Sequence, residues 1–115
     1  IEQDIQDAIT RFEQEKEEIK GRWYWEFVSR YRVKSTAVTM LSFRYPTRTL
    51  LIVNIDGDVA SVSARCQDRH EDMNLLLKKL IAGFPNADAG GHIPAAGGHF
   101  PADNLVEFKK RLHIV

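Results

Sequence analysis

The chain has 115 residues and no net formal charge, because 16 basic side chains balance 16 acidic ones. This length suits one compact domain, and a content of 43% hydrophobic and 28% charged residues excludes wholesale disorder. No apolar run approaches the ~20 residues that span a bilayer, and the single cysteine, Cys66, excludes an internal disulfide. We therefore expect a cytoplasmic protein with no membrane partner and, because it opens with Ile1 rather than Met, a piece of a longer protein.

Residues 1–20 predict an acidic helix with one apolar stripe, because apolar residues recur at spacings of three, four and seven. Gly21 would end this helix. Two roles fit it equally, a linker to a neighbouring element or a helix that lies on its own sheet. The segment carries seven acidic and three basic side chains, so the remaining residues have a net charge of +4. A phosphate-bearing ligand suits that sign, as does ordinary solvated charge.

Residues 22–29 are rich in aromatic side chains and predict a strand. Trp23, Trp25 and Phe27 would share one face, with Tyr24 on the other, either to stack bases or to fill a core. Residues 34–44 favour a helix, with a strand as the alternative, and Tyr45-Pro46 ends it.

Residues 50–55 form an apolar run typical of a strand buried on both faces. A hairpin turn at 56–58 and a return strand at 59–65 follow. Residues 70–83 predict a helix, and residues 102–112 a second one. Together these elements predict a single α/β domain, with a mixed sheet of about five strands flanked by helices. We divide the chain into the N-terminal helix, 1–20, and the domain proper, 21–115.

Residues 86–101 hold four of the seven glycines and two of the four histidines, and predict a tight loop. Paired glycines let a ligand approach the backbone amides closely, and His92 would either donate a hydrogen bond to a phosphate or stack on a base. The loop is neither a Walker A loop nor a dinucleotide fingerprint. His92 and His99 are badly spaced for a metal, and Cys66 has no ligand pair beside it. We therefore expect neither a metal site nor a catalytic residue in this chain, including Cys66 with His70.

The segment Ser63-Ala-Arg65, a helix, and then Ala89-Gly-Gly-His-x-x-Ala-Ala-Gly-Gly98 resembles the C-terminal DHH-associated domain of DHH-family phosphoesterases. That group includes RecJ-like single-strand exonucleases, nanoRNases and phosphoadenosine phosphatases. The resemblance covers roughly residues 22–112. It implies a separate N-terminal domain that holds two manganese or magnesium ions, and none of that domain's ligand motifs is present here.

The resemblance also implies which residues hold the substrate. Arg65 would bind a substrate phosphate with Ser63 beside it, and the glycine-histidine loop would contact the nucleotide. The predicted substrate-binding residues are Ser63, Arg65, Gly90, Gly91, His92, Ala95, Ala96 and Gly97. Ala89 departs from the family, in which many members carry a third glycine. A surface salt bridge remains the alternative role for Arg65, and fixing its own loop the alternative for His92.

Three functions follow as hypotheses. The first is the substrate-binding domain of a metal-dependent phosphoesterase that acts on single-stranded nucleic acid, oligonucleotides or nucleotide phosphates, docked on its own catalytic domain and inactive alone. The second is a nucleic-acid or tRNA-binding appendage such as that of alanyl-tRNA synthetases. The third is an oligomerisation domain, in which the aromatic strand would form a homodimer interface.

Overall fold

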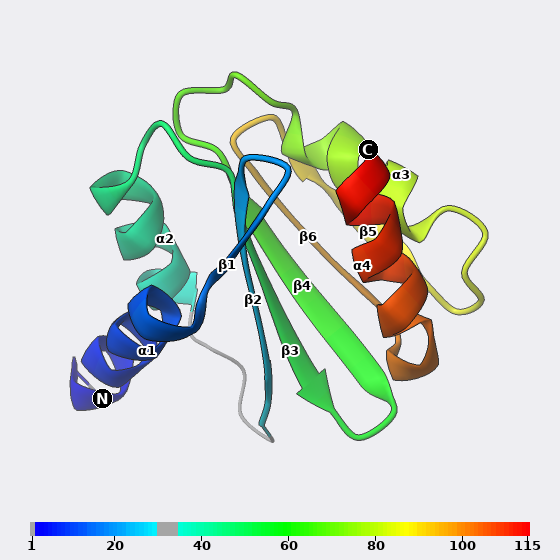
Figure 1. Cartoon of the computed structure of the whole chain (residues 1–115), viewed down its shortest axis with the longest axis horizontal. Helices are drawn as coiled ribbons and strands as arrows, with labels where there is room; N and C mark the ends of the chain where they lie inside the picture. The colour runs from blue at the N-terminus through cyan, green and yellow to red at the C-terminus, as the bar shows by residue number, and fades with distance from the viewer. Residues whose placement is uncertain (1, 30–34) are drawn as a thin grey trace.

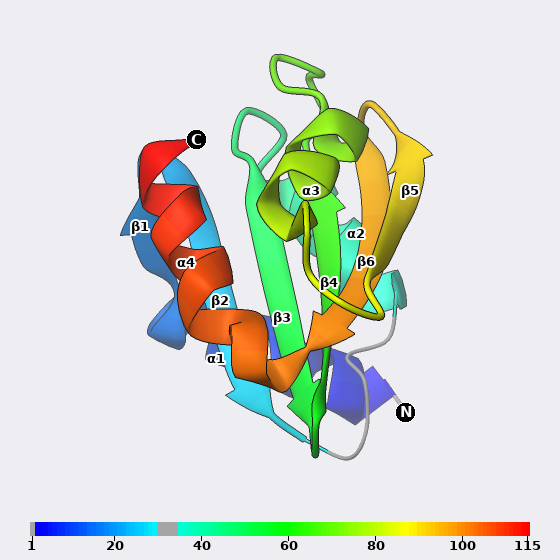
Figure 2. The same ribbon diagram turned by 90° about the vertical axis from the view of Figure 1, so that its right-hand side faces the viewer.

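The computed structural model describes residues 2–29 and 35–115, so Ile1 and Lys34, where two of the predicted helices begin, lie outside the described residues. One mixed sheet of six strands, in the order β1-β2-β3-β4-β6-β5, lies between two pairs of helices. Helices α1 and α2 lie on one side of the sheet, and α3 and α4 on the other (Figures 1 and 2). The predicted α/β domain with a mixed sheet and flanking helices is confirmed, with six strands rather than about five.

The elements follow one another as α1 (Glu2–Glu15), β1 (Glu17–Ile19), β2 (Arg22–Val28), α2 (Ser35–Arg44), β3 (Leu50–Asp56), β4 (Val59–Arg65), α3 (Met73–Ile81), β5 (Asp88–His92), β6 (Ala95–Pro101), a 3₁₀ turn (Ala102–Asn104) and α4 (Leu105–Ile114). Strands β2 and β3 are parallel, and every other neighbouring pair is antiparallel. No helix among these elements is long and apolar enough to cross a bilayer.

The predicted N-terminal helix is five residues too long. Helix α1 ends at Glu15, and residues 17–19 form strand β1, which pairs with β2. The turn between β1 and β2 contains Gly21, whose φ of +79° suits glycine. Ile19 drives this arrangement, because its side chain is buried in the core beneath α3 and α4. Of the two roles for α1, the structure shows a helix packed on its own sheet.

The aromatic strand fills a core instead of presenting a surface. Trp25 and Phe27 are 2% and 7% exposed and pack with Ile9 and Phe12 of α1. Tyr24 points to the opposite face, as its place in the strand predicts, and is fully buried there. Trp25 and Phe27 are therefore core residues and are not available to stack bases, whereas Trp23 is half-buried and the homodimer interface stays a prediction.

The glycine-rich segment is a β-hairpin and not a loop. Strands β5 and β6 meet at a turn of Ile93 and Pro94, and β6 pairs with β4. The turn is fixed from both sides, because the Pro94 carbonyl accepts a hydrogen bond from the Cys66 amide and the Ile93 carbonyl one from the Met73 amide, each 2.9 Å long. Asp72 caps the start of α3 at the same place. The hairpin is thus anchored to the end of β4 and the start of α3.

Candidate functional site

On one face of the sheet, strands β4, β6 and β5 carry mostly small or polar side chains. The register places Trp25, Ile52, Ser63, Gly97 and Gly90 in one row across β2, β3, β4, β6 and β5. The first two of these residues belong to the core under α1 and α2. The other three line open recesses on β4, β6 and β5, one of which is bordered by Val38 of α2. The β2 and β3 end of the row is therefore buried in the core. The β4, β6 and β5 end is an accessible part of the sheet face, which we call the floor.

An open recess of about 230 Å³ lies on this floor. Seven of the eight predicted substrate-binding residues line it, namely Ser63, Arg65, Gly90, Gly91, Ala95, Ala96 and Gly97. They are brought together because Arg65 pairs with Ala95 and Ser63 pairs with Gly97 across β4 and β6. The structure thus gathers these residues in one place, and their binding role remains a prediction.

His92 is the predicted residue that does not line the recess. It is exposed at the end of β5, across from Ala95, which is itself across from Arg65. His92 and Arg65 therefore share a row and a sheet face, and their backbones are two strand spacings or roughly 10 Å apart. Within the described part of the chain, His92 makes no side-chain hydrogen bond that would fix its own turn.

The glycines of the hairpin fall into two groups. A Cβ added to Gly91 would lie 2.6 Å from backbone atoms of β6, and one added to Gly98 would lie 2.5 Å from the Asp88 carbonyl, so the fold itself requires both. A Cβ on Gly90 would meet nothing within 4 Å, and one on Gly97 only the Val62 carbonyl at 3.4 Å. Because the fold does not require Gly90 and Gly97, their bare backbone suits the close approach of a ligand.

Arg65 lies at one wall of the recess, and no acidic side chain among the described residues compensates its charge. Its Nη1 donates to the backbone carbonyls of Ala64 at 3.0 Å and Ala96 at 3.4 Å. No carboxylate in residues 4–29 or 35–115 pairs with this guanidinium, which argues against the surface salt bridge. Burial lowers the pKa of Arg65, with no opposing contribution from a neighbouring acid. A half-buried cation without a counter-ion is a ready partner for an anion.

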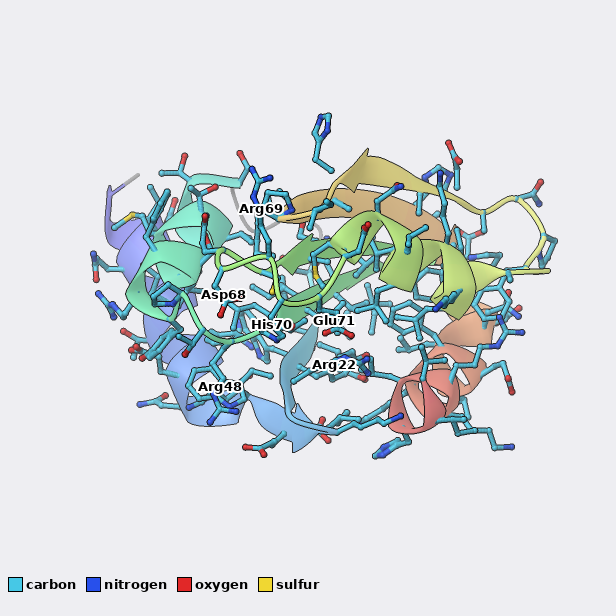
Figure 3. The ribbon with its side chains drawn as sticks, turned by 90° about the horizontal axis from the view of Figure 1, so that it is seen from above. Arg22, Arg48, Asp68, Arg69, His70 and Glu71 are labelled. Atoms are coloured by element: carbon cyan, nitrogen blue, oxygen red, sulfur yellow. The ribbon has the colours of Figure 1, made fainter. Side chains whose placement is uncertain are left out.

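A second polar recess, of about 400 Å³, lies at the β1–β2 turn. Here Arg22, which is only 7% exposed, pairs with Glu71 at 2.5 Å, and Thr49 donates to the same carboxylate at 2.9 Å. Figure 3 shows the Arg22 and Glu71 side chains pointing toward one another. The charges of Arg22 and Glu71 satisfy each other, and the exposed Lys20, which also lines this recess, donates to the Ile114 carbonyl.

Cys66, Asp68 and His70 are candidate metal ligands that the sequence analysis missed. The Cys66 Sγ lies 3.4 Å from the His70 Nδ1 and 3.5 Å from the Asp68 Oδ1. The expectation that Cys66 has no possible ligands beside it is therefore wrong, and the alternation 66, 68, 70 was the available signal. Hydrogen bonds from the His70 ring and backbone amide, which lower the pKa of Asp68, already explain the arrangement as a turn (Figure 3).

Fold and recess together define a small mixed α/β domain whose glycine hairpin and unpaired arginine suit an anionic ligand. The chain belongs to the DHHA1 domain family, whose sequence pattern matches residues 28–113. This confirms the resemblance to the DHH-associated domain. No protein of curated function matches the chain in sequence.

Solved structures share the fold at low sequence identity. A pGpG-specific phosphodiesterase, PggH from Vibrio cholerae, matches 97% of this chain with a TM-score of 0.67 and 11% identity. The C-Ala domain of alanyl-tRNA synthetase from Aquifex aeolicus matches 86% with a TM-score of 0.63 and 14% identity. A DHH-domain protein described as a member of a family of ribosomal proteins matches 97% with a TM-score of 0.59 and 14% identity. The chain spans 39% of the PggH chain, 31% of the DHH-domain protein and 98% of the C-Ala domain.

Proposed function

We propose that this chain is the substrate-binding domain of a DHH-family phosphoesterase that acts on nucleic acid, oligonucleotides or nucleotide phosphates, of the RecJ-like or oligonucleotide phosphodiesterase type. One observation carries the proposal, which is the uncompensated guanidinium of Arg65 beside the bare backbone of Gly90 and Gly97. An arginine fork and free amides form a suitable clamp for a phosphate. The likeness to a pGpG-specific phosphodiesterase supports a nucleotide ligand.

In this proposal the domain binds and orients, and the chemistry belongs to a separate catalytic domain. Arg65 holds a phosphate of the substrate, Ser63 and the glycine amides fix its orientation, and His92 donates from the rim of the recess. Positioning of this kind lowers the barrier by fixing the reacting groups in advance. Manganese or magnesium in the catalytic domain would supply the activated water. The chain alone should then bind weakly and hydrolyse nothing.

Calorimetric titration of the chain with the 5′-phosphorylated dinucleotide pApA tests this proposal. Arg65→Gln should weaken binding by roughly 10-fold to 100-fold, the contribution of charge-assisted hydrogen bonds. Lys79→Gln is the matched control, because it removes the same charge from the exposed face of α3 and should leave the affinity unchanged. Equal losses in the two variants would reduce the effect to net charge and contradict the proposal.

A hydrolysis assay tests the division of labour. With manganese present, the longer parent protein should cleave single-stranded DNA, short RNA or phosphoadenosine phosphate, and the chain alone should cleave none of them. Robust cleavage by the chain alone would overturn the proposal.

The second candidate, a tRNA-binding appendage, is favoured by the nearly complete match to the C-Ala domain. The two candidates differ in the domain that precedes Ile1 in the parent protein. A domain bearing Asp-His-His would support the phosphoesterase, and a synthetase core would support the appendage.

A further inference from the structure

A groove of about 320 Å³ continues the recess along the same sheet face. Ser63 and Gly97 line both, so the two spaces adjoin. Val38 of α2 and Ile52 of β3 form an apolar wall of the groove. Its polar side chains come from Asn54, Ser61, Ser63 and His99. An apolar wall with a few polar groups is typical of a small-molecule site, and the volume falls at the lower end of the usual range, about 300 Å³.

Asn54 is the feature of this groove that the fold does not explain. It interrupts an otherwise apolar strand and is only 6% exposed. Its Oδ1 is fully buried and has no hydrogen-bond partner in the described part of the chain. A buried acceptor without a donor destabilises a fold, so an apolar residue would serve β3 better. A half turn about χ2 exchanges the positions of the amide oxygen and nitrogen, and would present the oxygen to a donor in the groove, which Asn54 lines.

The register sets the distance between this groove and Arg65. Asn54 pairs with Ser61, and Ser61 with His99, in one row across β3, β4 and β6. Arg65 follows Ser61 by four residues on β4, which is roughly 13 Å at the rise of a strand. A single ligand that reaches both Arg65 and the groove must therefore be larger than a phosphate. Its middle would lie over Ser63 and Gly97, which line both spaces.

We propose that the groove binds the nucleobase of the nucleotide whose phosphate lies at Arg65, and that Asn54 accepts a hydrogen bond from an amino group of that base. Adenine fits best, because an asparagine amide pairs with its amino group and N7 together. This inference rests on the proposed function and adds the part of the substrate that is recognised.

The test compares two ligands that differ in one group. AMP and purine riboside 5′-monophosphate share the phosphate, the ribose and the ring system, and only AMP carries the amino group. The described chain should bind AMP roughly 3-fold to 10-fold more tightly, as expected for one net hydrogen bond. Titration followed by NMR at millimolar ligand measures both constants. Equal affinity for the two ligands would overturn the inference without any variant.

Variants assign the preference to Asn54. Asn54→Leu should abolish the preference for AMP while leaving the affinity for ribose 5-phosphate unchanged. Asn74→Leu, a matched change on α3 at the opposite face, should retain the preference. If Asn54→Leu does not fold, Ser61→Ala replaces it and should reduce the preference in the same direction. A preference that survives either change in the groove contradicts the assignment.

Ribose 5-phosphate separates this inference from the proposed function. If ribose 5-phosphate binds and Arg65→Gln weakens that binding, the result supports the phosphate site at Arg65. The comparison of AMP with purine riboside 5′-monophosphate then tests only the base subsite. If ribose 5-phosphate does not bind, the proposed function fails, and the inference fails with it.

Discussion

The glycine hairpin contains two kinds of glycine, and the structure predicts different effects when they are changed. Replacing Gly91 or Gly98 should reduce stability, and replacing Gly90 or Gly97 should reduce binding. Gly91→Ala and Gly98→Ala should lower the free energy of unfolding by about 1–3 kcal/mol or more, because each added methyl group meets backbone atoms. Gly90→Ala and Gly97→Ala should stay within about 0.5 kcal/mol of the parent chain, and should weaken pApA binding instead. Urea denaturation and titration of the four variants measure both effects. Similar stability losses in all four variants would show that folding requires all four glycines, and would remove the argument that Gly90 and Gly97 are there for a ligand.

Asn54 offers a stability test that needs no ligand. Asn54→Leu should raise the free energy of unfolding by about 1–2 kcal/mol, because it removes a buried acceptor that has no partner. Thermal unfolding of the parent chain and the variant measures the difference. A clear loss of stability would instead mean that the Asn54 amide supports the strand.

At the scale of single residues, the sequence analysis singled out Arg65 and the glycines, which the structure brings to one recess, and it did not single out Asn54. Arg65 stands at a strand end, and the glycine pairs are rare enough to be conspicuous. A lone asparagine in an apolar strand looks like an ordinary interruption. Its unpaired oxygen becomes visible only once β2, β3 and β4 are packed.

At the scale of elements, the ion pair of Arg22 and Glu71 joins the start of β2 to the loop before α3. Burial raises the pKa of Glu71, but hydrogen bonds from Arg22 and Thr49 outweigh it and leave the pKa below its ordinary value of 4.5. Because the pKa is lower in the folded than in the unfolded chain, the ionised carboxylate stabilises the fold. That stabilisation is complete above the unfolded pKa, and it disappears as the pH falls through the folded pKa.

Glu71→Gln should therefore lower the free energy of unfolding by about 3 kcal/mol at pH 7, since it leaves the Arg22 charge buried without a counter-ion. The difference from the parent chain should shrink as the pH falls below 4.5. Urea denaturation between pH 2.5 and 7, roughly the window in which carboxylates titrate, follows both chains. A difference that stays constant with pH would contradict the stabilising role of the ionised Glu71.

The elements that the sequence predicted well are those whose apolar pattern is set locally. The inner face of α3 is an example, because Met73, Leu76, Leu77, Leu80 and Ile81 are all buried as expected. The segment that forms strands β5 and β6 was predicted as a tight loop because it holds four of the seven glycines, and glycine is disfavoured in strands. Pairing with β4 and the two anchored carbonyls of the turn override that preference. Such long-range contacts leave no local pattern to read.

At the scale of the whole molecule, the order of the elements was predictable from the sequence. Which parts of the sheet face the helices cover was not. Helices α1 and α2 pack on β2 and β3, and on the same face β4, β6 and β5 line open recesses, one of which is bordered by Val38 of α2. The extra strand β1 was hidden inside the acidic helix pattern. The predicted division at residue 20 would separate β1 from its partner β2, although the boundary itself remains a prediction.

The most direct test of the phosphate site is an NMR map of the amides that shift when the chain binds pApA. The account predicts that the largest shifts fall at Arg65, Gly90, Gly91 and Gly97, around one recess. Shifts centred instead on Arg22 and Glu71, at the second polar recess, would contradict it.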